Sequence, residues 1–268
     1  MVAFLASDRA AFRDHNPGRW RHFDHLIPRM ENQDLVVVAV VTLAGVMRGI
    51  TGFGGAMLMA PPLSTTLGPV PAVVTALTLE AAAALVMFPD AWPRINRRML
   101  VYLTAPAVLT VPIGGYFLVN VDAFVARKVI AAVVVIFALA LLCGWRYSKP
   151  PRPATSIALG SIVGLLLGAT SVGAPPVILY LLASSDSQAV TRANLTVFVT
   201  AISGIGLVML LAIGAVTAPL AAYAGIMIIP FLLATWLGGK LFGRMNGSSV
   251  RAAALGLMLF VGTVGLLV

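Results

Sequence analysis

The chain has 268 residues, a formal net charge of +9 and a mean hydropathy of +0.99, and 60% of its residues are hydrophobic while only 10% are charged. This composition excludes an ordinary soluble domain and predicts an integral membrane protein. The apolar runs are far longer than the roughly 10-residue strands of an outer-membrane barrel, so the spans should be helices. The basic residues lie at predicted membrane boundaries without an aromatic-lined binding module, so we expect no nucleic-acid partner.

The polar segment 1–34 comes first and carries five arginines, five acidic residues and all three histidines. No long apolar core follows its early charges, so we do not expect a signal peptide. The histidines lack companion cysteines and a sustained ligand spacing, and we therefore expect no metal site. The segment is predicted to be a solvated cytoplasmic tail.

Eight apolar segments follow the tail, and they are close to the roughly 20 residues that a helix needs to cross the hydrocarbon core. They predict an all-α integral membrane protein with about eight membrane segments. The segments are 35–63, 70–88, 99–119, 123–145, 156–182, 195–213, 216–239 and 252–268.

Basic residues cluster in three of the connections between these segments. Cytoplasmic loops of membrane proteins are enriched in lysine and arginine, so we expect these connections to lie in the cytoplasm together with the tail. The clusters are Arg94, Arg97 and Arg98, then Arg146, Lys149 and Arg152, and finally Lys240, Arg244 and Arg251.

The second half of the membrane domain repeats the first. The motif "GITGFGGAMLMAPPL" begins at Gly49 and its counterpart "GATSVGAPPVILYLL" begins at Gly168, and the same register aligns Thr75 with Asn194. A double glycine late in each half, in "VPIGGYFLV" and "ATWLGGKLF", continues the correspondence. We attribute these landmarks to an old duplication.

The duplication divides the domain into a first repeat at 35–147, a linker at 148–155 and a second repeat at 156–268. Four simple crossings in each half would make the halves parallel, whereas an odd number of segments would invert them. The loop 89–98 has three arginines and its counterpart 214–218 has no charge, which favours inversion.

Both repeat motifs interrupt an apolar segment with glycine or proline, a sequence sign of the binding site of a secondary transporter. Glycine tolerates backbone conformations outside the helix, and proline favours the first turn of a new one. We therefore expect broken or re-entrant helices, with half-helices starting near Gly55 or Ala56 and at Pro175 and Pro176. Their free N–H groups would face a central cavity and suit an anion. Close packing through small residues is the alternative explanation of these glycines.

Arg48, Glu80 and Arg192 lie within or beside predicted spans, where an ionisable side chain is costly and marks a functional site by default. Arg48 directly precedes the first break, and its planar guanidinium suits an oxyanion. A ligand-free ion pair with Glu80 is the alternative. Glu80 is the one acid well inside a span and is the leading candidate for proton coupling. Arg192, near the start of its helix, either contacts the anion or extends to the membrane interface.

The remaining predicted contacts are backbone groups at the breaks and side chains that donate hydrogen bonds. The hydroxyls among them can instead bond to the carbonyls of their own helix. The predicted substrate-binding residues are Arg48, Thr51, Gly52, Gly54, Gly55, Thr75, Thr170, Ser171, Gly173 and Asn194, and we expect no catalytic residue.

The motif "TGFGGAMLMAPPL", its echo "TSVGAPPVILYLL", the duplicated apolar domain and the late double glycines resemble the sulfite exporter TauE/SafE family of membrane permeases. The resemblance covers residues 35–268. It implies ion-coupled secondary transport of a small sulfur-containing anion, such as sulfite, thiosulfate or an organosulfonate, in the bacterial inner membrane. The second copy carries "VGAPP" where the family has further glycine, so we expect the first half to contribute more of the site.

These observations predict a secondary transporter that exposes an anion site alternately to each side of the membrane. H+ or Na+ would be the coupling ion, membrane lipid would surround the protein, no cofactor is needed, and a homodimer is left open. Transport of another small anion such as a carboxylate, and a passive channel, are the alternatives. A membrane enzyme is not expected, because the spans contain no histidine, no acidic pair and no serine–histidine arrangement.

Overall fold

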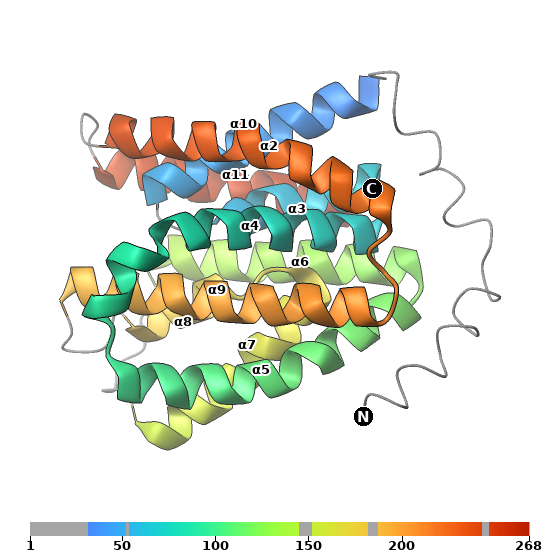
Figure 1. Ribbon diagram of the computed structural model, residues 1–268. Coiled ribbons are helices and arrows are strands. Elements are labelled where there is room, and N and C mark those ends of the chain that lie inside the picture. Colours follow the sequence, from blue (N-terminus) through green and yellow to red (C-terminus); the bar gives the residue numbers. More distant parts are fainter. Residues whose placement is uncertain (1–31, 52–53, 145–151, 182–186, 243–246, 268) are drawn as a thin grey trace.

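A computed structural model describes residues 32–51, 54–144, 152–181, 187–242 and 247–267. Within these ranges the regular structure is entirely helical, as the sequence predicts (Figure 1). The elements are α2 (Asn32–Thr51), α3 (Gly55–Thr66), α4 (Pro69–Ala91), the 3-10 helix η1 (Trp92–Arg94), α5 (Arg97–Asn120), α6 (Ala123–Leu142), α7 (Pro153–Thr170), α8 (Ala174–Leu181), α9 (Gln188–Ala212), α10 (Ala218–Phe242) and α11 (Gly247–Leu267).

The described helices have the lengths and apolar surfaces of membrane spans. Seven of them are long and apolar enough to cross a bilayer, and a shorter apolar stretch, Leu255–Leu267, lies within α11. Large apolar side chains such as Leu109, Val86 and Ile229 are exposed on the outside of the bundle. Such a surface suits contact with lipid, and the predicted all-α membrane fold is confirmed.

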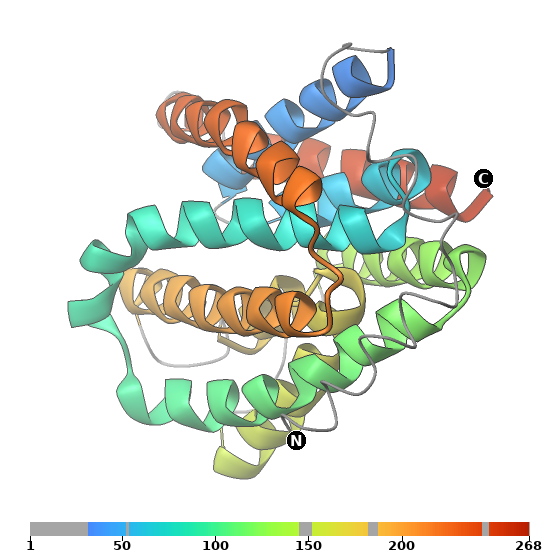
Figure 2. The same cartoon turned by 45° about the vertical axis from the view of Figure 1, so that its right-hand side comes forward.

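The helices occur twice in the same order: a long helix, a short one and three long ones. The short helices α3 and α8 begin at Gly55 and Ala174, so the helices are broken where the sequence predicts it. The helices in corresponding positions, α4 and α9, lie side by side and run in opposite directions, and so do α6 and α11 (Figures 1 and 2). The five α-helices from α2 to α6 and the five from α7 to α11 therefore enter the bundle from opposite ends.

Repeat-matched glycines hold the long helices together. Helix α2 packs along α10, and α7 packs along α5. A Cβ atom at Gly49 would overlap the carbonyl oxygen of Thr235, and one at Gly168 would overlap that of Val111. Small-residue packing thus explains this glycine of each motif, whereas the breaks that follow need another explanation.

Helix α8 is fixed by hydroxyl groups at its far end. The Tyr180 hydroxyl lies 2.7 Å from the Ser156 Oγ atom and 2.9 Å from the Thr155 Oγ1 atom, both in the first turn of α7. Because Tyr180 and Ser156 are buried, water does not compete for these hydrogen bonds. The start of α8 is therefore held in a defined position in the interior.

Aromatic residues lie beside cations near the ends of several helices. The Arg97 guanidinium lies 5.9 Å from the ring centroid of Trp92, and the Lys240 ammonium lies 3.6 Å from that of Trp236. Helices α4 and α10 both end at the same end of the bundle, whereas α2 begins at the opposite end (Figure 1). A cytoplasmic position for this basic end would place the start of α2 on the other side of the membrane. The start of α2 and the basic connections therefore do not lie on the same side of the membrane in this arrangement, contrary to our expectation that both are cytoplasmic.

Candidate functional site

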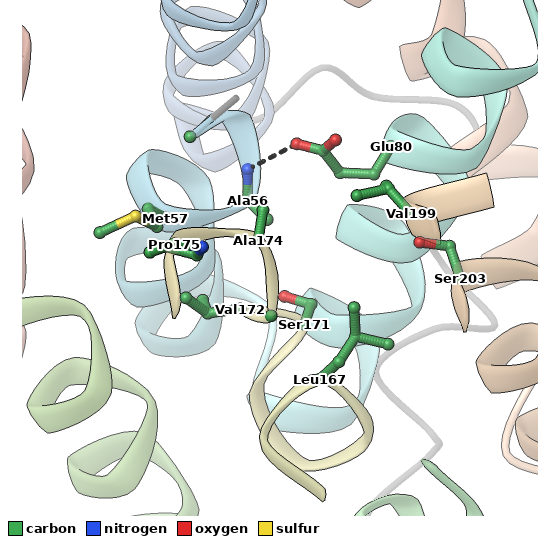
Figure 3. Close-up of a pocket in the computed structure, with 12 residues that line it drawn as sticks. Ala56, Met57, Glu80, Leu167, Ser171, Val172, Ala174, Pro175, Val199 and Ser203 are labelled. Carbon is green, nitrogen blue, oxygen red and sulfur yellow. Dashed lines mark hydrogen bonds between the residues drawn. The ribbon is translucent and has the colours of Figure 1, made fainter. Parts of the chain in front are cut away.

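The two helix breaks meet at one pocket in the interior of the bundle (Figure 3). Its empty space is about 310 Å³, including the part that opens to solvent. One wall is the first turn of α3, and the facing wall is the break after α7 with the first turn of α8. Helices α4 and α9 complete it with Glu80, Val199 and Ser203.

A residue with a left-handed backbone lies at each break. Gly54 has a φ of 89° and precedes α3, while Ser171 has a φ of 60° and follows α7. Ser171 is the one residue other than glycine with a positive φ in the described part of the chain. Serine seldom adopts this conformation, which costs free energy and persists only where the surroundings enforce it.

Glu80 links the first break to the pocket. Its Oε1 atom accepts a hydrogen bond of 2.9 Å from the backbone N–H of Ala56, and its Oε2 atom lies 2.5 Å from Nη1 of Arg48. The carboxylate thus sits at the start of α3, where the helix dipole and a free N–H group favour a negative charge. A Cβ atom at Gly55 would lie 2.7 Å from Oε1, so this approach requires glycine.

The ion pair changes the interpretation of Arg48. The residues Arg48 and Glu80 are only 4% and 5% exposed, so the pair is buried and each charge depends on the other. Arg48 does not line the pocket and reaches it through Glu80. The alternative ion pair is what the structure shows, and a direct contact of Arg48 with an anion would require Glu80 to release it.

The second break is built without a charged side chain. The Thr170 hydroxyl donates to the carbonyl of Leu166 at 2.6 Å, and the Ser171 hydroxyl donates to the carbonyl of Thr170 at 2.5 Å. Of these two predicted contacts, Ser171 lines the pocket together with Gly173, whereas Thr170 does not line it. The prolines Pro175 and Pro176 have no N–H group, so the first turn of α8 has few free donors.

The predicted contacts Thr75 and Asn194 are not among the residues that line the pocket. The Asn194 Oδ1 atom accepts a hydrogen bond of 2.8 Å from the backbone N–H of Asn96, which ties α9 to the connection between η1 and α5. Both residues are buried, and the Thr75 Oγ1 and Asn194 Nδ2 atoms have no hydrogen-bond partner in the described structure. Their positions favour a role in packing over contact with a ligand in this pocket.

The remaining predictions concern Thr51, Gly52 and Arg192. Gly52 and the side chains of Thr51 and Arg192 lie outside the described residues. The same is true of the tail with its three histidines. Their predicted roles stay predictions.

Sequence reasoning overlooked Ser203. This residue of α9 lines the pocket, is fully buried and has a hydroxyl without a hydrogen-bond partner. A serine in an apolar helix is usually explained by a bond to its own helix, as in Thr200, which donates to the carbonyl of Thr196 at 2.8 Å. The sequence pattern does not distinguish these two situations.

An all-helical membrane bundle with a pocket at two helix breaks is an arrangement typical of secondary transporters. A comparison with protein families gives the same answer, because the model of the family described as sulfite exporter TauE/SafE matches residues 37–264. The chain therefore belongs to this family of membrane transporters. Comparisons with curated proteins and with solved structures found no match.

Proposed function

We propose that the protein carries a small sulfur-containing anion, such as sulfite, thiosulfate or an organosulfonate, across the bacterial inner membrane. The observation that carries this proposal is the convergence of two helix starts and Glu80 on one interior pocket. The backbone N–H groups and positive dipole ends of helix starts suit an oxyanion. The family makes a sulfur oxyanion the first class of substrate to test.

Charge balance supports coupling to a proton. Arg48 and Glu80 together are neutral, so an additional anion would leave a net negative charge in a buried site, which is costly. Protonation of Glu80 removes that charge and weakens its hold on Arg48 and on the N–H of Ala56. Both donors then become available to the anion. One proton would enter with each added negative charge, and Na+ in place of H+ is the alternative coupling ion.

Alternating access would follow from inverted repeats. Residues 35–147 and 156–268 would form the two halves, and the opposite directions of α4 and α9 and of α6 and α11 support this division. The pocket lies where elements of both halves meet. A tilt of one half against the other would expose it first on one side of the membrane and then on the other.

Thermal unfolding of the purified protein with sulfite, thiosulfate, methanesulfonate, sulfate and acetate tests the anion class. A ligand that binds only the folded protein stabilises it by about 2.7 kcal/mol at 100 times its Kd. We expect a saturable rise in Tm with one or more sulfur oxyanions. A rise with acetate alone would assign the carrier to carboxylates, and the absence of any rise would contradict an anion site.

Proteoliposomes with Glu80→Gln test the coupling and distinguish a carrier from a channel. The wild type should show counterflow of the bound anion and accumulation driven by a proton gradient. Glutamine imitates the protonated acid, so the variant should keep counterflow but lose proton-driven accumulation. Unchanged proton-driven accumulation would exclude Glu80 as the coupling group, and conduction without counterflow would favour a channel.

A further inference from the structure

The unpartnered hydroxyl of Ser203 lies at the pocket wall opposite the start of α3. Ser203 is 0% exposed, and its Oγ atom has no hydrogen-bond partner in the described structure. Figure 3 shows this hydroxyl turned into the pocket, toward the side that carries Val199 and Glu80. A buried hydroxyl without a protein partner is costly unless a water molecule or a ligand bonds to it, and the hydroxyl of Ser203 faces a pocket that can hold either.

The surrounding protein does not use this hydroxyl. One turn of helix away, Thr200 satisfies its own hydroxyl with a carbonyl of α9, so the helix offers this solution but Ser203 does not take it. The other hydroxyl in the pocket, that of Ser171, already donates to the carbonyl of Thr170. Ser203 is thus the side-chain hydroxyl of the pocket that is free to donate to something else.

The first turn of α8 needs such a donor. A helix start can bind an anion through its free N–H groups, but Pro175 and Pro176 remove two of them. In the first half, the corresponding turn of α3 retains the N–H of Ala56, which holds the Glu80 carboxylate. An anion beside α8 therefore finds fewer backbone donors than at an ordinary helix start, and a side chain can provide another.

The repeat register makes this arrangement specific to the second half. The offset that aligns Thr75 with Asn194 also aligns Glu80 with Val199 and Ala84 with Ser203. The first half thus contributes an acid to the pocket where the second contributes an apolar residue. The second half contributes a hydroxyl where the first has alanine.

We propose that Ser203 is a ligand-contacting residue of this pocket and donates a hydrogen bond to an oxygen of the bound oxyanion, replacing the donors that the α8 prolines lack. This inference rests on the proposed anion transport. The ligand would lie between Glu80 on α4 and Ser203 on α9, with one oxygen directed to each side. A sulfur oxyanion meets this requirement, because it carries several oxygens on one central atom and can accept hydrogen bonds from two directions.

The experiment is a thermal titration with sulfite of the wild type, Ser203→Ala and Ser64→Ala. Ser64 is a matched control, because its buried hydroxyl bonds to the carbonyl of Pro61 at 2.7 Å and lies outside the pocket. We expect Ser203→Ala to weaken sulfite binding roughly tenfold, as the loss of one hydrogen bond to a charged group does. The Tm of this variant without ligand should equal or exceed that of the wild type. Ser64→Ala should lower that Tm and leave the sulfite affinity unchanged.

Equal sulfite affinities of the wild type and Ser203→Ala would overturn this inference alone. A larger loss of ligand-free Tm in Ser203→Ala than in Ser64→Ala would also overturn it, because the hydroxyl would then serve the fold. If the wild type gave no shift with sulfite, thiosulfate, methanesulfonate, sulfate or acetate, the proposed function itself would fail and this inference with it.

Discussion

Each helix break contains a left-handed residue, but the two residues lie at different positions relative to the helices, and the chemistry of the breaks differs. At the first break, Gly54 makes the left-handed turn and Glu80 joins Arg48 to the start of α3. At the second break, Ser171 makes the turn, prolines occupy the first turn of α8, and the position of the acid is taken by Val199. Both breaks therefore line the same pocket, whereas Glu80 and its partner Arg48 come from α4 and α2.

In the proposed proton-coupled carrier, this difference would separate two requirements. Alternating access depends on geometry that both halves share, whereas a single titratable group suffices to link one proton to one anion. A second acid at the position of Val199 would add another buried negative charge beside the anion. The asymmetry is thus compatible with the inverted arrangement and does not weaken it.

The largest expected effect comes from breaking the charge pair. Arg48→Leu leaves Glu80 charged and buried, and such a loss costs about 3–5 kcal/mol of the free energy of unfolding. The double variant Arg48→Leu with Glu80→Leu leaves no unpaired charge and should recover most of that loss. Thermal unfolding without ligand measures both. If the double variant were no more stable than Arg48→Leu, the two charges would not be coupled as the structure indicates.

The beginnings of the broken helices were predictable because glycine and proline restrict the backbone locally. Gly55 and Pro175 therefore located α3 and α8 to within a residue or two. The long-range partners were less accessible. The sequence allowed two interpretations of Arg48, a contact with an anion or an ion pair with Glu80, because both are charged residues in apolar spans. The structure shows the ion pair.

Neutral polar residues gave no comparable signal. The Asn194 Oδ1 atom accepts a hydrogen bond from Asn96, a residue 98 positions away, and that contact depends on how α9 packs. The expected donation of a hydrogen bond from Asn194 to the ligand stays a prediction. Ser203 was overlooked because its hydroxyl differs from that of Thr200 only in lacking a partner. These roles depend on tertiary packing, which a single sequence does not reveal.

Glycine substitutions sharpen the comparison at the starts of the short helices. Gly55→Ala would place a Cβ atom 2.7 Å from Glu80 Oε1, and Gly173→Ala would place one 2.9 Å from the Leu167 Cβ atom. Overpacking should cost each variant about 1–3 kcal/mol of stability. Gly55→Ala alone should also impair proton-driven accumulation, because it displaces the carboxylate. Thermal unfolding and proteoliposome uptake distinguish these effects, and an equal loss of coupling in both variants would contradict the assignment.

The repeat-matched pair Thr75 and Asn194 provides a comparison away from the pocket. Asn194→Ala leaves the buried N–H of Asn96 without its acceptor and should cost about 1–3 kcal/mol of stability. Thr75→Val removes a hydroxyl that has no partner and should leave the protein equally stable or more stable by up to about 1 kcal/mol. Neither variant should change the sulfite affinity. A selective loss of sulfite binding in either would restore that residue to the ligand site.

The smallest expected effects concern the left-handed turns themselves. Gly54→Ala should cost about 1–2 kcal/mol, because a side chain at a φ of 89° meets the following carbonyl. Ser171→Gly relieves the same strain at a φ of 60°, but glycine makes the unfolded chain more flexible by about 0.4–1 kcal/mol, so the net change should be close to zero. Chemical or thermal unfolding of both variants measures the difference. A strongly destabilised Ser171→Gly would mean that the hydroxyl bonded to Thr170, and not the turn alone, holds the second break.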